Sequence, residues 1–169
     1  MSMRFKLDLL PKLELQRIDR PEGRVYATPD GKQYRSCTGV VGQLNKAAID
    51  NWKRRVGKER AQMVSTKASK RGTAIHNLCE KYLLNEENYF ENTMPIHRQD
   101  FLKIRPRLDR HVGLIRGIEH MMYSDELEAA GTTDLIAEWD GVPSIIDFKT
   151  SKSKKEIAKI RHYFCQGTA

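Results

Sequence analysis

The sequence has 169 residues, of which 39% are hydrophobic and 31% are charged, a balance typical of a soluble globular protein. Thirty Lys and Arg residues against 22 Asp and Glu residues give a formal net charge of +8, which favours a polyanionic partner such as nucleic acid. No apolar run reaches the roughly 20 residues of a membrane helix, and three cysteines without CxxC spacing signal neither a disulfide framework nor a zinc or iron–sulfur site. We therefore expect a cytoplasmic protein with reduced thiols and no membrane contact.

The first predicted element is a β-hairpin within residues 1–45, which we call the N-terminal hairpin region. Residues 25–28 and 33–37 are β-prone runs on either side of Pro29-Asp30-Gly31-Lys32, a sequence with Pro and Gly where a tight turn needs them.

Residues 46–125 are predicted to be helical. Apolar residues recur every three to four positions in residues 47–65, 73–84 and 98–122, which predicts three amphipathic helices, the last with a kink at Pro106. His76 and Glu80 share a face of the second helix, and Glu119 falls near the end of the third. A histidine on such a helix is more often a packing residue than a metal ligand, so its role depends on its neighbours.

The third region, residues 126–169, contains a predicted hairpin and a following helix. Asp140-Gly141, a dipeptide typical of type I′ turns, separates strand-like residues 134–139 and 142–150. Counting outward from a two-residue turn places Asp134 opposite Asp147, and the alternation of a strand points Lys149 to the same face as Asp147.

Two carboxylates opposite each other destabilise a sheet unless a cation lies between or beside them. Mg²⁺ or Mn²⁺ would suit oxygen ligands and could activate water against a phosphodiester. An Asp-x-Lys pair alone is common on exposed strands and does not by itself indicate a catalytic site. The prediction of a metal site therefore depends on the opposed Asp134 and on the motifs upstream.

Three motifs occur in order: Arg71-Gly-Thr-Ala-Ile-His76, Gly131-Thr-Thr-Asp134 and Ile146-Asp147-Phe-Lys149-Thr-Ser. Together they resemble the motifs of RecB-type exonucleases of the PD-(D/E)XK superfamily, and most of all mitochondrial genome maintenance exonuclease and its bacteriophage relatives. The resemblance extends from about Tyr34 to the C-terminus and implies an α/β restriction-endonuclease-like core in which helices flank a central mixed sheet. From the chain length we expect one nuclease domain over residues 1–169.

The resemblance also implies the roles of single residues. His76, Asp134 and Asp147 would bind the metal, Lys149 would be the catalytic lysine, and Gln166 matches a glutamine on the following helix. Glu119 matches a more loosely placed acidic position. In the family a tyrosine four residues after the glutamine and a further strand follow, whereas this sequence ends at Ala169, so we expect a domain truncated at its C-terminus.

The expected function is metal-dependent hydrolysis of DNA from single-stranded ends. Basic runs around the motifs make Arg71, Lys152 and Lys154 candidate DNA contacts. A single-strand-binding or recombination protein is a possible partner, and a phage-encoded protein would act in the host cytoplasm. The alternatives are an exonuclease that resects double-stranded ends for recombination and a catalytically silent DNA-binding fragment.

Overall fold

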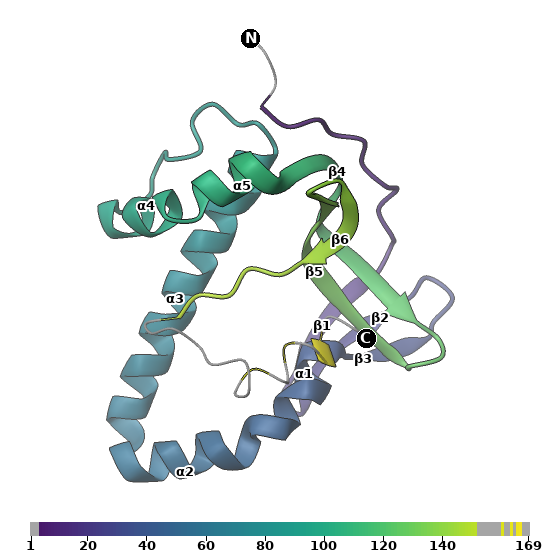
Figure 1. Cartoon of the computed structure of the whole chain (residues 1–169). Coiled ribbons are helices and arrows are strands. Elements are labelled where there is room, and N and C mark those ends of the chain that lie inside the picture. Colours follow the sequence, from purple (N-terminus) through teal and green to yellow (C-terminus); the bar gives the residue numbers. More distant parts are fainter. Residues whose placement is uncertain (1–3, 152–159, 161–162, 164, 167–169) are drawn as a thin grey trace. The chain divides into compact units, whose positions relative to one another are not determined.

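A computed structural model describes residues 4–151, 160, 163, 165 and 166 (Figure 1). Along these residues the elements are β1 (Gln16–Arg20), β2 (Gly23–Ala27), β3 (Gln33–Ser36), α1 (Cys37–Gly42), the 3₁₀ helix η1 (Gln43–Asn45), α2 (Lys46–Val56), α3 (Lys58–Leu83), α4 (Pro95–Leu102), α5 (Arg105–His111), β4 (Val112–Ser124), β5 (Ala129–Trp139) and β6 (Val142–Ile146). The predicted α/β class with a central mixed sheet is confirmed.

Within the described residues, six strands form the sheet in the order β1-β2-β3-β5-β4, and β6 pairs with β5. The sheet is mixed because β3 runs parallel to β5, whereas β1–β2, β2–β3 and β5–β6 are antiparallel. Ala27 pairs with Gln33 across the first predicted turn, so that hairpin is confirmed. Strand β1 was not predicted, because its sequence Gln-Arg-Ile-Asp-Arg is polar and mostly exposed.

The predicted hairpin of β5 and β6 turns at Asp140 and Gly141, which both have positive φ, 53° and 79°, as a type I′ turn requires. Its register runs from Trp139↔Val142 to Leu135↔Ile146. Pro143 lies in the second pair from the turn, which in a two-residue hairpin is not hydrogen-bonded, so its missing N–H costs no bond within the hairpin. The ladder ends one pair before the predicted pairing of Asp134 with Asp147.

The helices differ from prediction in their boundaries. The helix predicted at residues 47–65 is divided at Gly57, whose φ of 85° ends α2. The residues after Gly57 belong to the 26-residue α3, which continues through the helix predicted at residues 73–84. None of the described helices is long and apolar enough to cross a membrane.

The predicted helix at 98–122, and with it the helical assignment of residues 46–125, was wrong from Val112 onward. The chain leaves α5 at Val112 and forms β4, which pairs with β5 and buries Ile115. Gly113 lies so close to Glu138 of β5 that a Cβ atom there would be 2.8 Å from Oε2. The pairing with β5 therefore overrides the helical spacing of the apolar residues.

The chain divides into two compact units. The first comprises Met1–Leu10, Val64–His120 and Thr133–Thr150, and the second Pro11–Met63, Met121–Thr132 and Ser151–Ala169. The core of the first unit consists of Phe5, Ile75, Leu78, Cys79, Tyr82, Leu83, Tyr89, Phe101, Leu108, Ile115, Leu135 and Ala137. The core of the second consists of Leu15, Tyr26, Tyr34 and Ala130. One nuclease domain over residues 1–169 stays a prediction.

Candidate metal centre

Three potential metal ligands from three elements of the first unit lie together. His76 is on α3, Glu119 on β4 and Asp134 on β5, and one ligand atom of each lies within 4.8 Å of the others. The buried stripe of α3 fixes the helix against the core, and His76 follows Ile75 of that stripe and remains partly exposed. Buried Leu135 fixes β5 in the same core and thereby places Asp134.

His76 faces an oxygen acceptor at each ring nitrogen. Nδ1 lies 3.2 Å from Oδ1 of Asp134, and Nε2 lies 2.7 Å from the carbonyl oxygen of Phe148. The hydrogen bond to Asp134 raises the pKa of His76, while burial of the ring acts in the opposite direction. A metal ion bound to this residue would compete with a proton for a ring nitrogen.

Asp134 is nearly buried, with 9% of its surface exposed, and both carboxylate oxygens are engaged. Oδ1 faces His76, and Oδ2 accepts a hydrogen bond of 2.5 Å from the backbone N–H of Phe148. The backbone of Phe148 is thus held on both sides, its N–H by Asp134 and its C=O by His76. Phe148 stands between Asp147 and Lys149, so these contacts fix the segment that carries the predicted catalytic pair.

Glu119 reaches the group through an unusual backbone conformation. Its φ of 46° lies in the left-handed region, which is rare for glutamate and redirects a side chain within a strand. Desolvation raises the pKa of its carboxyl group, the negative charges of Asp134 and Glu80 raise it further, and His76 lowers it. A carboxylate in these surroundings is stabilised by an added cation.

Asp147 and Lys149 follow β6 and form an ion pair with each other. Both residues are exposed. Among the described residues, the group of ligand atoms contains Glu119 and does not contain Asp147. The predicted contact of Asp134 with Asp147 is replaced by the hydrogen bond of Asp134 to the backbone of Phe148.

Arg71 and Gln166 make other contacts in the described part of the chain. Arg71 donates from Nε to Oδ2 of Asp100 at 2.8 Å, so its guanidinium is part of an ion pair. Gln166 belongs to the second unit, where its carbonyl oxygen is 4.0 Å from Sγ of Cys37. Lys152 and Lys154 lie outside the described residues.

Glu80 was not among the predicted site residues. It lies one turn after His76 on α3 and contributes to the electrostatic environment of Glu119. The spacing of four residues from His76 was the available signal, because such residues share a helix face.

An imidazole nitrogen and two carboxylates fit a divalent cation. Carboxylate oxygens suit Mg²⁺ and Mn²⁺, and an imidazole ligand shifts the preference toward Mn²⁺ and later transition metals. The three residues therefore form a group that could hold a metal ion. No protein-family model matches the sequence, and no curated protein is significantly similar to it.

Proposed function

We propose that the chain is a metal-dependent deoxyribonuclease that hydrolyses phosphodiester bonds from single-stranded DNA ends. The observation that supports it best is that Asp134 and His76, two members of the ligand group, also hold the backbone of Phe148 between Asp147 and Lys149. Two residues of a group that could hold a metal ion are thereby in direct contact with the segment that carries Lys149. In this proposal the sheet and its helices belong to a restriction-endonuclease-like core.

Each residue has a distinct part in the proposed chemistry. His76, Glu119 and Asp134 would hold Mg²⁺ or Mn²⁺, and such an ion, when bound, would polarise the phosphodiester and ease deprotonation of the attacking water. Lys149 would bring positive charge to the phosphate as negative charge develops there. Asp147 orients Lys149 through their ion pair, and as a further carboxylate close by it could also join the ligands.

The experiment that tests the proposal is cleavage of an end-labelled single strand in Mg²⁺ or Mn²⁺, with a 5′ or a 3′ block. The unmodified chain is compared with Asp134→Asn, which keeps an oxygen acceptor for Phe148 but loses the charge that binds a cation. Glu87→Gln is the matched control, because Glu87 is an exposed carboxylate outside the group and the charge change is the same.

The proposal expects short products from the unmodified chain and the control, and none in EDTA or from Asp134→Asn. Inhibition of cleavage by only one of the two end blocks, 5′ or 3′, would establish the end from which the strand is digested. Binding of the strand without cleavage at any metal concentration would favour the catalytically silent alternative.

A further inference from the structure

Residues 46–63 form a basic segment that comprises α2 and the first turns of α3, all within the second unit. It has six basic residues (Lys46, Lys53, Arg54, Arg55, Lys58 and Arg60) against the two acidic residues Asp50 and Glu59. Its surplus of four positive charges is half of the net charge of +8 of the whole chain.

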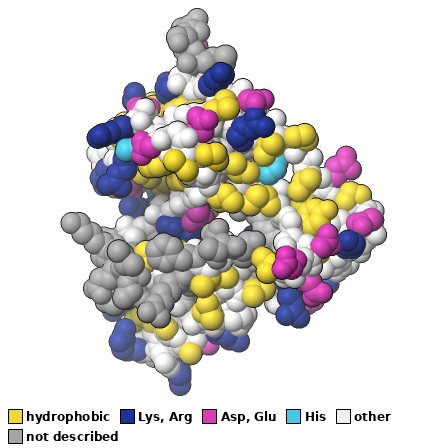
Figure 2. Space-filling view, turned by 45° about the vertical axis from the view of Figure 1, so that its right-hand side comes forward, with side chains coloured by type: hydrophobic (Ala, Val, Ile, Leu, Met, Phe, Trp, Pro, Cys, Tyr) yellow, Lys and Arg dark blue, Asp and Glu magenta, His cyan; other side chains and the backbone are white. Residues whose placement is uncertain are grey.

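Eight described cations outside this segment are paired with carboxylates. Lys and Arg side chains are spread over the face in Figure 2, and many lie beside Asp or Glu. Carboxylates within 4.0 Å are recorded for the basic residues Arg17, Arg24, Lys32, Arg71, Lys103, Arg105, Arg116 and Lys149. Their positive charge is therefore largely compensated by neighbours.

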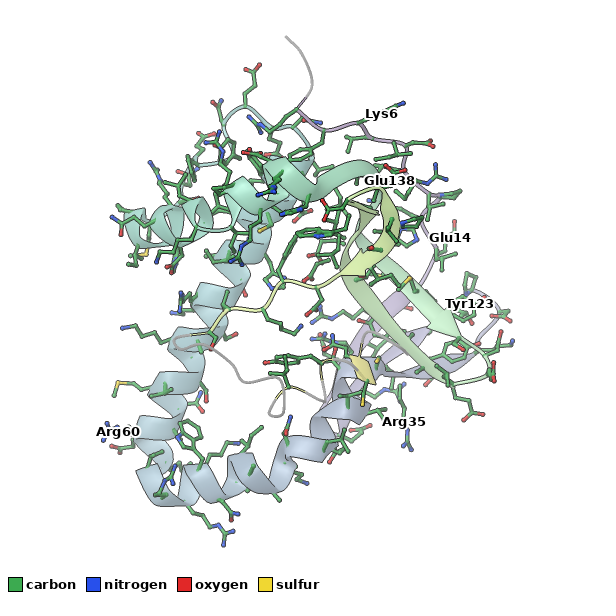
Figure 3. All side chains as sticks on the ribbon, viewed as in Figure 1. Lys6, Glu14, Arg35, Arg60, Tyr123 and Glu138 are labelled. Carbon is green, nitrogen blue, oxygen red and sulfur yellow. The ribbon has the colours of Figure 1, made fainter. Side chains whose placement is uncertain are left out.

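The six cations of the basic segment differ from these paired residues. All six are exposed, and within the described part of the chain none of them forms an ion pair with a carboxylate. Arg54 donates a hydrogen bond to the neutral side chain of Asn51, and Figure 3 shows Arg60 on the early part of α3. The positive charge of this segment thus remains available to an anionic partner.

Helix stability explains only part of this charge. Lys53, Arg54 and Arg55 lie in the last turn of α2, where cations interact favourably with the helix dipole. Lys58 and Arg60 lie in the first turn of α3, where the same dipole disfavours cations. A requirement beyond the helix itself is needed to explain them.

We propose that the basic segment binds the phosphate backbone of single-stranded DNA, with Arg55, Lys58 and Arg60 as the principal contacts. The choice of DNA rests on the proposed function, whereas the anionic nature of the partner rests on the unpaired charge. A lipid surface is disfavoured because an interfacial helix needs a wide exposed apolar face. In α2 Ile49 is exposed, but Trp52 and Val56 are half-buried, so only part of the apolar side of this helix is exposed.

The test compares two triple variants that each remove three positive charges. One is Arg55→Gln/Lys58→Gln/Arg60→Gln, and the matched control is Lys12→Gln/Arg35→Gln/Arg107→Gln, whose residues are also exposed and without a carboxylate partner in the described chain. Circular dichroism establishes that both variants fold. Fluorescence anisotropy of a labelled oligothymidylate in EDTA then gives the affinity as a function of salt.

We expect the first variant to bind about tenfold or more weakly and its salt dependence to fall by about two units of slope, since each phosphate contact on a single strand contributes about 0.7. The control should change affinity by less than about twofold. Equal weakening in both variants would overturn the proposal, because net charge alone would then explain binding. Binding to phosphatidylglycerol vesicles in place of DNA would also overturn it.

The unmodified chain is assayed in parallel for hydrolysis of a small phosphodiester in Mn²⁺, which separates this inference from the proposed function. Hydrolysis together with equal DNA binding by both variants would refute the role of the basic segment and leave the nuclease proposal intact. Selective loss of DNA binding without any hydrolysis would support the segment and count against the nuclease.

Discussion

Glu119 combines a backbone conformation that disfavours glutamate with a carboxylate close to His76 and Asp134. A non-glycine residue held at positive φ costs about 1 to 3 kcal/mol and persists where the surrounding structure imposes it. Here the paired strand β4 imposes it, and the consequence is a third ligand atom within 4.8 Å of the other two. Backbone strain and ligand placement therefore coincide in one residue.

Glu119→Gly should separate these two effects. Glycine accepts positive φ without strain, so we expect the free energy of unfolding in EDTA to rise by about 1 kcal/mol while Mn²⁺ binding weakens. Glu119→Gln keeps the strained backbone and removes only the charge, so it should lose metal affinity and gain less stability than the glycine variant, its gain coming only from relief of the repulsion by Asp134 and Glu80. Urea unfolding with and without Mn²⁺ measures both quantities, and a glycine variant less stable than the unmodified chain would contradict the assignment of strain.

Asp100 provides a pH-dependent test. Its hydrogen bond from Lys103 and then that from Arg71 lower the pKa of its carboxyl group, against the opposing effect of desolvation. A lowered pKa in the folded state contributes stability above the unfolded value, about 3.9, and this contribution is lost as the pH falls through the folded value. Asp100→Asn should therefore cost about 1 kcal/mol at pH 7 and progressively less toward about pH 3. A cost independent of pH in urea titrations would rule out this linkage.

At the scale of elements, the parts that follow from local chemistry could be predicted. The turn at Asp140-Gly141 requires positive φ twice, and the dipeptide signals it directly. The placement of His76 and Asp134 on neighbouring elements was also foreseen. Glu119 was predicted to lie near the end of a helix, and this was wrong. Its position depends on the pairing of β4 with β5 and on its positive φ, and the residues around Glu119 in the sequence predict neither.

Strand β4 shows why the helical assignment failed. Ile115 and Ile118 are three residues apart and fit a helical period, but Gly113 and Gly117 lie between and beside them. Glycines disfavour a helix and permit the close approach of a neighbouring strand. A Cβ at Gly117 would lie 3.2 Å from Cδ1 of Ile136 on the neighbouring strand β5, an approach that no spacing of apolar residues reveals.

Gly113→Ala should therefore destabilise the protein. Its Cβ would meet Glu138 at 2.8 Å from Oε2 and 3.1 Å from Cβ, and Glu138, labelled in Figure 3, accepts the N–H of Leu114 at 3.2 Å. Displacing this side chain should cost about 1 to 3 kcal/mol through overpacking and the lost hydrogen bond. Gly42→Ala is the control, since its Cβ would meet nothing within 4 Å. Chemical denaturation of both variants tests the difference, and equal stability would refute the close approach.

At the scale of the whole molecule, the candidate metal ligands and the basic segment fall in different compact units, each with its own core. The two tryptophans are divided in the same way, with Trp52 in the second unit and Trp139 in the first. Trp139 stacks on His111 with ring centroids 5.0 Å apart, so its fluorescence reports the packing of the first unit. Each single-tryptophan variant therefore reports the unfolding of one unit.

We expect Mn²⁺ to raise the unfolding midpoint in Trp52→Phe, where Trp139 is the reporter, more than in Trp139→Phe. A ligand that binds only the folded state stabilises it by about 2.7 kcal/mol at a hundred times its dissociation constant, and His76, Glu119 and Asp134 all belong to the first unit. Adding Asp134→Asn to either variant should abolish the shift. Equal shifts from both reporters would show that the two units unfold as one cooperative structure, and no shift from either would remove the three residues as a metal centre.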